Sequence, residues 1–250
     1  MGKHKMPIIN SLMATKKAFE SRLQKKITAP IESCRHYCGF RYGSKSFNPY
    51  ENYIKGLHEN EDEEILKRRF ELFLARYRPT NFGEVLGVHL LKDYPLWCFP
   101  WGRNCRPGNG WVDSPEDVCD VMTHFCAKGI PKGLVQKEHF WHKRAYESIA
   151  TSGYKPQEFG YIQLLEIKVN ADCVYIVTDG NHRISALAAL GHKTVDAKIH
   201  LWRNVRVQHI EKFEQVVCGN MFQEDALRII EAYRDGVERP FMSELPADIV

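Results

Sequence analysis

The stretch Thr178-Asp179-Gly180-Asn181-His182-Arg183 links two regular patterns in the chain. The apolar run at 174–177 precedes it and predicts a β-strand, and the spacing of apolar residues over 184–190 predicts a helix. A strand that turns at a glycine into a helix directs free backbone N–H groups and the positive end of the helix dipole at one spot. Because Gly180 has no Cβ, an anion can approach the backbone there. The stretch therefore predicts a phosphate-binding turn.

The cationic side chains of this turn support the same interpretation. His182 and Arg183 fall in the first turn of the predicted helix, where a positive charge opposes the helix dipole by roughly 0.3 kcal/mol or more. A bound anion would offset that cost. Gly191 is placed to end the helix, and the alternating residues 194–199 predict a returning strand. We therefore expect one compact strand–turn–helix–strand unit.

Two sets of residues between about 137 and 201 form a recognisable pattern. The first set is Ala145-Tyr146-Glu147-Ser148-Ile149-Ala150 with Gly153 and Pro156, followed by an expected strand from Tyr161 to Ile167. The second is Tyr175-Ile176-Val177-Thr178-Asp179-Gly180-Asn181-His182-Arg183, then Ala186, Leu190-Gly191 and Val195. Together they resemble the core of the ParB/sulfiredoxin superfamily, in which a glycine and one or two basic residues open a helix over a nucleotide's phosphates. The resemblance implies an α/β fold of α+β type, with a small mixed sheet and a helical N-terminal part.

The departures from that family narrow the expected activity. Sulfiredoxins carry a catalytic cysteine immediately before the His-Arg pair, whereas this chain has Asn181, so sulfinic acid reduction is not expected. Chromosome-partitioning ParB proteins continue into a helix-turn-helix domain, but the residues after the core read as two amphipathic helices without a basic recognition face. The superfamily also includes free-serine kinases built on the same nucleotide site.

Further residues are candidates for the nucleotide site and its chemistry. Arg144 and Ser148 lie one helical turn apart, and their positions resemble nucleotide contacts that close over the phosphates together with residues 180–183. Asp179 is interpreted as a Mg²⁺ ligand or a general base, although an aspartate before a glycine is also a common turn former. Glu147 and Glu158 are further candidate bases for activating an acceptor hydroxyl, and surface ion pairs are the alternative for each.

Composition and charge limit the class of protein. The 250 residues are 44% hydrophobic and 26% charged, which is typical of a globular protein, and no apolar run approaches the length of a membrane span. The first residues lack the features of a signal peptide, so a cytoplasmic location is expected. The formal net charge of +4 is uneven, because residues 1–45 hold ten Lys/Arg and two acidic residues. This basic stretch predicts a solvated helix at about 8–26, with contact to a membrane surface or a nucleic acid as the alternative.

The eight cysteines do not have the spacing of a structural zinc site, so we expect mostly reduced core residues. Cys34, His36 and Cys38, and the pair His139 and His142, are weaker candidates for a metal site, since no spacing template fits them.

Three regions are predicted along the chain: a mainly helical region at 1–135, the nucleotide-binding core at 136–203, and helices packed on the core at 204–250. Further helices are expected at about 61–77, 114–128 and 137–151. In the segment 95–102, Trp97 and Phe99 are interpreted as packing residues, and Trp101 as packing or as part of a stacking wall for a sugar or base. Arg103 and Arg106 are candidate contacts for a substrate anion.

The expected function is binding of a nucleoside triphosphate, ATP with Mg²⁺, and transfer of its phosphate to a small-molecule or sugar hydroxyl. A glycan acceptor is considered because the segment 77–84 resembles ParB-like proteins encoded with bacterial surface-polysaccharide genes. Two alternatives are a nucleotide-gated protein that binds or cleaves nucleic acid, and a regulator that binds nucleotide without turnover.

Overall fold

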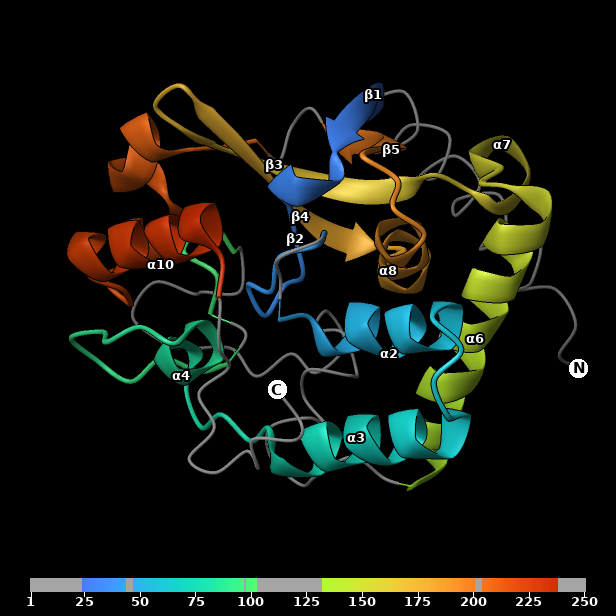
Figure 1. The fold of residues 1–250 in the computed structure, drawn as a ribbon. Coiled ribbons are helices and arrows are strands. Elements are labelled where there is room, and N and C mark those ends of the chain that lie inside the picture. The colour runs from blue at the N-terminus through green and yellow to red at the C-terminus, as the bar shows by residue number, and fades with distance from the viewer. Residues whose placement is uncertain (1–23, 44–46, 97, 103–131, 201–203, 238–250) are drawn as a thin grey trace, which may run out of the picture.

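The fold is described from a computed structural model, over residues 24–43, 47–96, 98–102, 132–200 and 204–237. In these ranges it is an α/β protein with one mixed sheet, as the sequence predicts (Figure 1). The sheet has six strands in the order β1-β5-β3-β4-β2, and β6 also pairs with β3. The strands are β1 (Gln24–Pro30), β2 (Cys34–Arg35), β3 (Ile162–Val169), β4 (Asp172–Asp179), β5 (Thr194–His200) and β6 (Val205–Arg206).

A hairpin forms the centre of the sheet. β3 and β4 are antiparallel and are joined at Asn170, whose positive φ of 55° is a conformation that asparagine tolerates better than most residues. β3 also runs parallel to β5 and β6, and β2 runs parallel to β4. Most residues of β3 are buried, as expected for a central strand.

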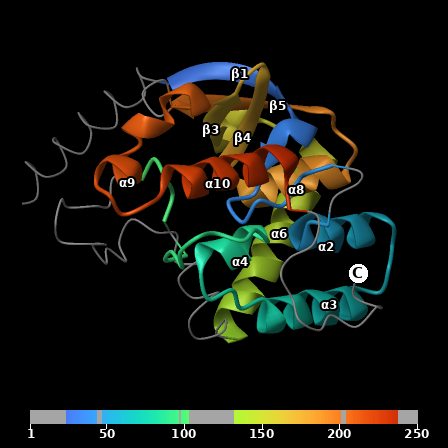
Figure 2. The same cartoon turned by 90° about the vertical axis from the view of Figure 1, so that its left-hand side faces the viewer.

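Helices cover the sheet and extend away from it (Figures 1 and 2). α8 (Asn181–Ala189) follows β4 and lies between the sheet and α2 (Pro49–His58), and α3 (Glu63–Arg76) lies beyond α2. α6 (Lys132–Ser152) passes all three along one side of the molecule. α10 (Gln223–Asp235) packs on β3, β4 and α4 (Phe82–Leu86). The shorter elements are α7 (Pro156–Phe159), α9 (Glu214–Val217) and the 3-10 helices η1 (Ile31–Ser33) and η2 (Val207–Lys212).

The beginning of the described chain corrects one expectation. The predicted helix at 8–26 is wrong at its end, because Gln24, Lys25 and Lys26 belong to β1, which pairs antiparallel with β5. The rest of that helix lies outside the described residues, as does its proposed contact with a membrane or nucleic acid. Pairing along the edge of the sheet outweighs the weak helical stripe. Two strands of the sheet therefore come from the region predicted to be mainly helical.

The aromatic segment near residue 100 packs as the sequence predicts where it is described. The ring of Phe99 contacts those of Phe82 and Trp101, at centroid distances of 5.2 and 5.6 Å, and Trp101 also packs on Phe213. Trp97, Arg103 and Arg106 lie outside the described residues, and so does the helix predicted at 114–128. No helix in the described ranges is both long and apolar enough to cross a membrane.

The expectation that most cysteines are reduced core residues is confirmed for part of the described cysteines. Cys34, Cys38 and Cys98 are buried with reduced thiols, and Cys173 is a half-buried thiol. Burial raises the pKa of Cys34 to about 12 and also raises the pKa of Cys98. Cys218, in contrast, is disulfide-bonded.

Candidate functional site

The turn between β4 and α8 has the geometry expected of an anion-binding turn. β4 ends at Asp179, Gly180 adopts a left-handed conformation with φ 92°, and the first helical hydrogen bond runs from the Ile184 N–H to the Gly180 carbonyl at 3.0 Å. The N–H groups of residues 181–183 therefore have no partner within the helix. Within the described ranges, no side chain caps this end of α8. The residues 180–183 are half-exposed, so a ligand from solvent can reach these N–H groups.

Gly180 is required by both its conformation and its surroundings. A Cβ at this position would lie 2.8 Å from Ile162 Cγ1 and 2.8 Å from Arg183 Nη2. The positive φ adds strain for any residue with a side chain. The glycine predicted from the sequence is therefore fixed by the close approach of β3 and of Arg183.

Arg183 links the start of α8 to the end of β4 and to residues 159–160. Its Nη1 donates hydrogen bonds to the carbonyls of Phe159, at 3.1 Å, and Gly160, and its Nη2 donates to Asp179 Oδ2 at 3.3 Å. We call Arg183 and Asp179 with these carbonyls the outer clasp. The Asp179 side chain is 68% exposed, so its carboxylate is open to solvent beside the uncapped N–H groups.

His182 points inward, toward α6. Its Nε2 lies 3.0 Å from Glu138 Oε2, and its ring packs edge-on against the ring of His142 with 4.3 Å between the centroids. Glu138 is 7% exposed and His142 is fully buried. We call Glu138, His142 and His182 the inner cluster. Adjacent residues of the turn, His182 and Arg183, thus contact different segments, α6 for His182 and residues 159–160 and 179 for Arg183.

The inner cluster is lined by aromatic rings and by further histidines. Tyr50 stacks on both His36 and His142, at centroid distances of 5.0 and 5.2 Å. Burial lowers the pKa of His36 to about 3, with a smaller contribution from the nearby His182. Burial is also the main cause that lowers the pKa of His142 well below its usual range, again with His182 contributing. His36 and His142 are therefore neutral imidazoles near pH 7.

Asn181, at the position of the sulfiredoxin cysteine, has a structural contact. Its Oδ1 accepts a hydrogen bond of 2.9 Å from the hydroxyl of the buried Tyr42. This bond ties the first residue of α8 to the segment that precedes α2.

The structure does not bring the other predicted residues to the turn. Arg144, Glu147 and Ser148 are exposed on α6, on the side away from Glu138 and His142. The guanidinium of Arg144 lies over the Trp141 ring, 5.5 Å from its centroid. Glu158 is on α7, close in sequence to the outer clasp, and its carboxylate lies 4.0 Å from Lys155 Nζ.

Glu138 was not predicted as a site residue, and His142 was paired with His139 as a candidate metal ligand, whereas the structure pairs it with Glu138 and His182. His139 and His142 both pack on Tyr53 and Phe70, but among the described residues only His142 belongs to the group of potential metal ligands. The informative spacing is Glu138 to His142, because residues four apart share one face of a helix. The third member of the inner cluster, His182, comes 40 residues after His142 in the chain, and the packing of α6 on α8 brings it close to the other two.

The inner cluster is also the group of potential metal ligands in the described part of the chain. One ring nitrogen of His142, one of His182 and a carboxylate oxygen of Glu138 lie within 4.8 Å of one another. Among the described residues, neither Asp179 nor the set of Cys34, His36 and Cys38 forms such a group. The donor types suit zinc and similar transition metals better than Mg²⁺, which prefers oxygen ligands.

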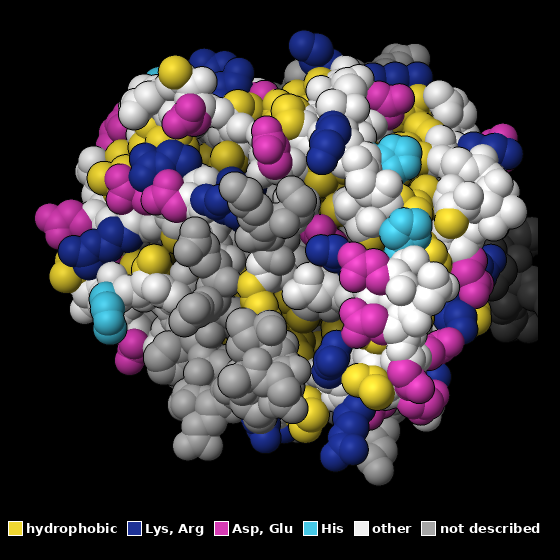
Figure 3. Space-filling view, in the orientation of Figure 1, with side chains coloured by type: hydrophobic (Ala, Val, Ile, Leu, Met, Phe, Trp, Pro, Cys, Tyr) yellow, Lys and Arg dark blue, Asp and Glu magenta, His cyan; other side chains and the backbone are white. Residues whose placement is uncertain are grey.

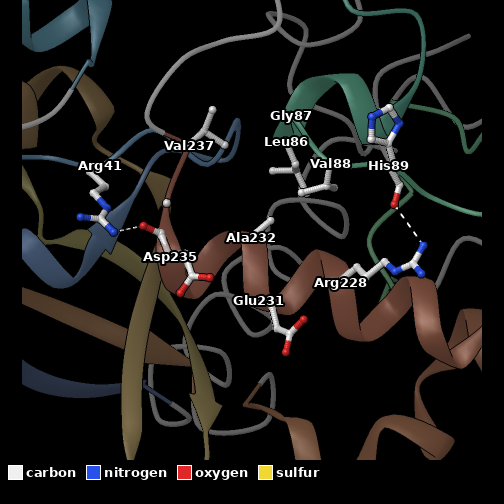
Figure 4. Close-up of a pocket in the computed structure, with 11 residues that line it drawn as sticks. Arg41, Leu86, Gly87, Val88, His89, Arg228, Glu231, Ala232, Asp235 and Val237 are labelled. Carbon is white, nitrogen blue, oxygen red and sulfur yellow. Dashed lines mark hydrogen bonds between the residues drawn. The ribbon is translucent and has the colours of Figure 1, made fainter.

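Two hollows in the surface lie elsewhere. One, of about 610 Å³, opens between α4 and α10 and is lined by Arg41, His89, Arg228, Glu231 and Asp235, among others (Figure 4). The other, of about 290 Å³, lies between α2 and α3. Neither contains a residue of the turn. On the face in Figure 3, basic and acidic side chains are interspersed, so the chemistry of the turn is the stronger guide to function.

Comparisons with known proteins add no relative. No family model, curated protein or solved structure matches the chain. The geometry of the turn and its surroundings is therefore the guide to function.

Proposed function

We propose that the chain binds the phosphates of a nucleoside triphosphate at the N-terminus of α8 and transfers phosphate to a small-molecule or sugar hydroxyl. The observation that carries the proposal is the uncapped start of α8 at the left-handed Gly180. Three N–H groups without helical partners and the positive end of the helix dipole attract an anion there.

The residues around this end of the helix have complementary parts. The backbone of residues 181–183 would hold phosphate oxygens, and Asp179 would hold Mg²⁺ or accept the proton of the acceptor hydroxyl. Its carboxylate is exposed on the same turn, and its contact with Arg183 reduces its repulsion of a phosphate group. Positioning and charge neutralisation supply most of the catalysis in phosphoryl transfer.

Arg183 has a different role here from a direct phosphate contact. Because its guanidinium already donates to Phe159, Gly160 and Asp179, we assign it to holding the outer clasp in place beside the bound phosphates. Arg144 and Ser148 would have to act through a rearrangement of α6, so they are secondary candidates.

The test is a thermal-shift panel of ATP, CTP, GTP and ADP with Mg²⁺. A ligand that binds only the folded state raises the melting temperature by mass action. We expect at least one triphosphate to raise it and the matching nucleoside to leave it unchanged. Acceptor-dependent release of ADP would then separate a kinase from a regulator that binds without turnover. A panel in which no phosphate ligand shifts the melting temperature would contradict the proposal.

One observation favours a second candidate, binding of nucleic acid. Lys26 on β1 and Lys198 on β5 are paired across the two strands, and both ammonium groups lie over the Tyr161 ring, at 5.0 and 5.1 Å from its centroid. Surfaces that bind single-stranded nucleic acid combine cationic and aromatic side chains. The discriminating measurement is binding of a labelled oligonucleotide at increasing salt, which should weaken steeply if phosphates are contacted.

A further inference from the structure

The inner cluster combines three features of a metal site. Its donors are two imidazoles and a carboxylate, which come from two different helices, α6 and α8. The distance between His182 Nε2 and Glu138 Oε2 is 3.0 Å. Ligands at about 2.0–2.1 Å around a tetrahedral Zn²⁺ are separated by about 3.3 Å. His142 Nδ1 lies 3.8 Å from the same Glu138 oxygen, and one donor atom of each of the three residues lies within 4.8 Å of the others, so side-chain rotations are needed to bring all three donors to one ion.

The two ring nitrogens of His142 have separate environments. Nδ1 lies 2.8 Å from the backbone carbonyl of Glu138, and the carbonyl can only accept, so Nδ1 carries the proton. Nε2 then carries a lone pair, and this buried atom has no hydrogen-bond partner among the described residues. Burying such an atom without a partner costs free energy, whereas a metal-ligating histidine usually donates its other N–H to a carbonyl in this way.

Packing holds the ring of His142 in place. Tyr50 stacks on it at 5.2 Å, and the ring of Phe70 approaches it at 5.8 Å between centroids. His182 differs, because 34% of its side chain is exposed. His142 is thus held rigidly, whereas part of the His182 side chain remains open to solvent.

We propose that Glu138, His142 and His182 bind a transition-metal ion, with Zn²⁺ the best fit to their chemistry. Three protein ligands leave the fourth position of a tetrahedral ion for water or a ligand oxygen, as in catalytic zinc sites. Because His182 also belongs to the uncapped turn of α8, the ion would bind close to the proposed phosphate site.

This site does not depend on the proposed nucleotide binding, and metal alone tests it. The untagged full chain is first treated with a chelator and then titrated with Zn²⁺ by calorimetry and with Co²⁺ by visible absorption. We expect one ion per chain, with the d–d bands of tetrahedral Co²⁺ and without a thiolate charge-transfer band. Prior alkylation of the cysteines should leave the Co²⁺ spectrum unchanged.

Variants of the ligands decide the assignment. His182→Gln and Glu138→Gln should each lower the Zn²⁺ affinity at least about 100-fold. His139→Gln, which removes a buried histidine of the same helix outside the cluster, is the matched control and should bind as the wild type does. His142→Gln removes a fully buried ring, so circular dichroism must show that it folds, and the half-exposed His182 keeps the test decisive if it does not. Zn²⁺ binding that is absent, lost on alkylation, or equal in the wild type and His182→Gln would overturn the proposal.

Discussion

The two neighbouring basic residues of the turn at 179–183, His182 and Arg183, make different kinds of contact. In the outer clasp, the Arg183 guanidinium donates hydrogen bonds to backbone carbonyls and to the exposed Asp179. The inner cluster places His182 against a buried carboxylate and a buried imidazole. The outer side is built to hold segments together, whereas the inner side has a buried acceptor atom without a protein partner in the described structure. A His-Arg pair in a sequence therefore does not imply that both side chains contact the same ligand.

The largest effect is expected from the outer side, in Asp179→Asn. If Asp179 holds Mg²⁺ or accepts the acceptor's proton, loss of its charge should lower phosphate transfer by about 100-fold or more. The melting temperature should hardly change, since the amide oxygen can still accept the hydrogen bond from Arg183. The measurement is acceptor-dependent ADP release.

The control is Asp172→Asn at the other end of β4, which should retain full activity. An Asp179→Asn protein with wild-type turnover would move the catalytic role to another carboxylate, and Glu147 and Glu158 would be tested next. One that unfolds would make Asp179 structural.

Gly180→Ala should disturb both sides at once. The positive φ costs about 1–2 kcal/mol for a residue with a side chain. The contacts of the new Cβ with Ile162 and Arg183 should add about 1–3 kcal/mol. Urea denaturation measures the loss in the free energy of unfolding. Gly191→Ala is the matched control, because Gly191 has a similar φ of 79° and its new Cβ would have no described atom within 4 Å. Equal losses in the two variants would show that the close approach at Gly180 has no energetic weight.

The inner side should make stability depend on pH through His36. Its pKa is about 3 in the folded protein and near 6.5 in the unfolded chain, so the unfolded state binds more protons between these values. The contribution of His36 to the free energy of unfolding is therefore fully present above pH 6.5. It is lost as the pH falls toward 3, by at most about 1.4 kcal/mol per pH unit. His36→Gln should lower the slope of the free energy of unfolding against pH by up to about 1.4 kcal/mol per pH unit, which corresponds to one bound proton. Denaturation curves at pH 7, 6 and 5 measure it, and identical slopes in both proteins would contradict the burial of a neutral His36.

The smallest effect is expected from thiol modification. Cys34 and Cys98 are buried, and the pKa of each is raised by burial, so neither is a thiolate near pH 7. Alkylation under native conditions should leave nucleotide turnover largely intact. Complete inactivation at one accessible cysteine, with protection by nucleotide, would show that thiol chemistry does take part.

The local part of the fold was predictable because it depends on short-range patterns. The strand–turn–helix–strand unit is confirmed as β4, α8 and β5, and the helix predicted at about 61–77 is α3. Within α3, however, the apolar Ile65 is 51% exposed, and its neighbour Leu66 is buried. Periodicity predicts a helix but not the exact face that packs, which depends on the partner helices.

Features that depend on distant contacts were not predictable in the same way. The pairing of β1 with β5 joins residues about 170 apart in the chain, and nothing within residues 24–30 indicates that partner. The same limit applies to the site. The glycine and the two basic residues of the turn could be predicted from the sequence, whereas the different contacts of His182 and Arg183 depend on where α6 and α7 lie.

The central claim is that the start of α8 binds phosphate groups, and calorimetric titration of ATP and adenosine with Mg²⁺ tests it most directly. We expect ATP to bind at least about tenfold more tightly than adenosine, since charge-assisted hydrogen bonds contribute about 1.5–3 kcal/mol each. Arg183→Ala, which releases the outer clasp, should weaken ATP binding more than adenosine binding, and the exposed Arg206→Ala serves as the control. Equal affinities of the wild-type protein for ATP and adenosine, or the absence of ATP binding, would contradict the claim.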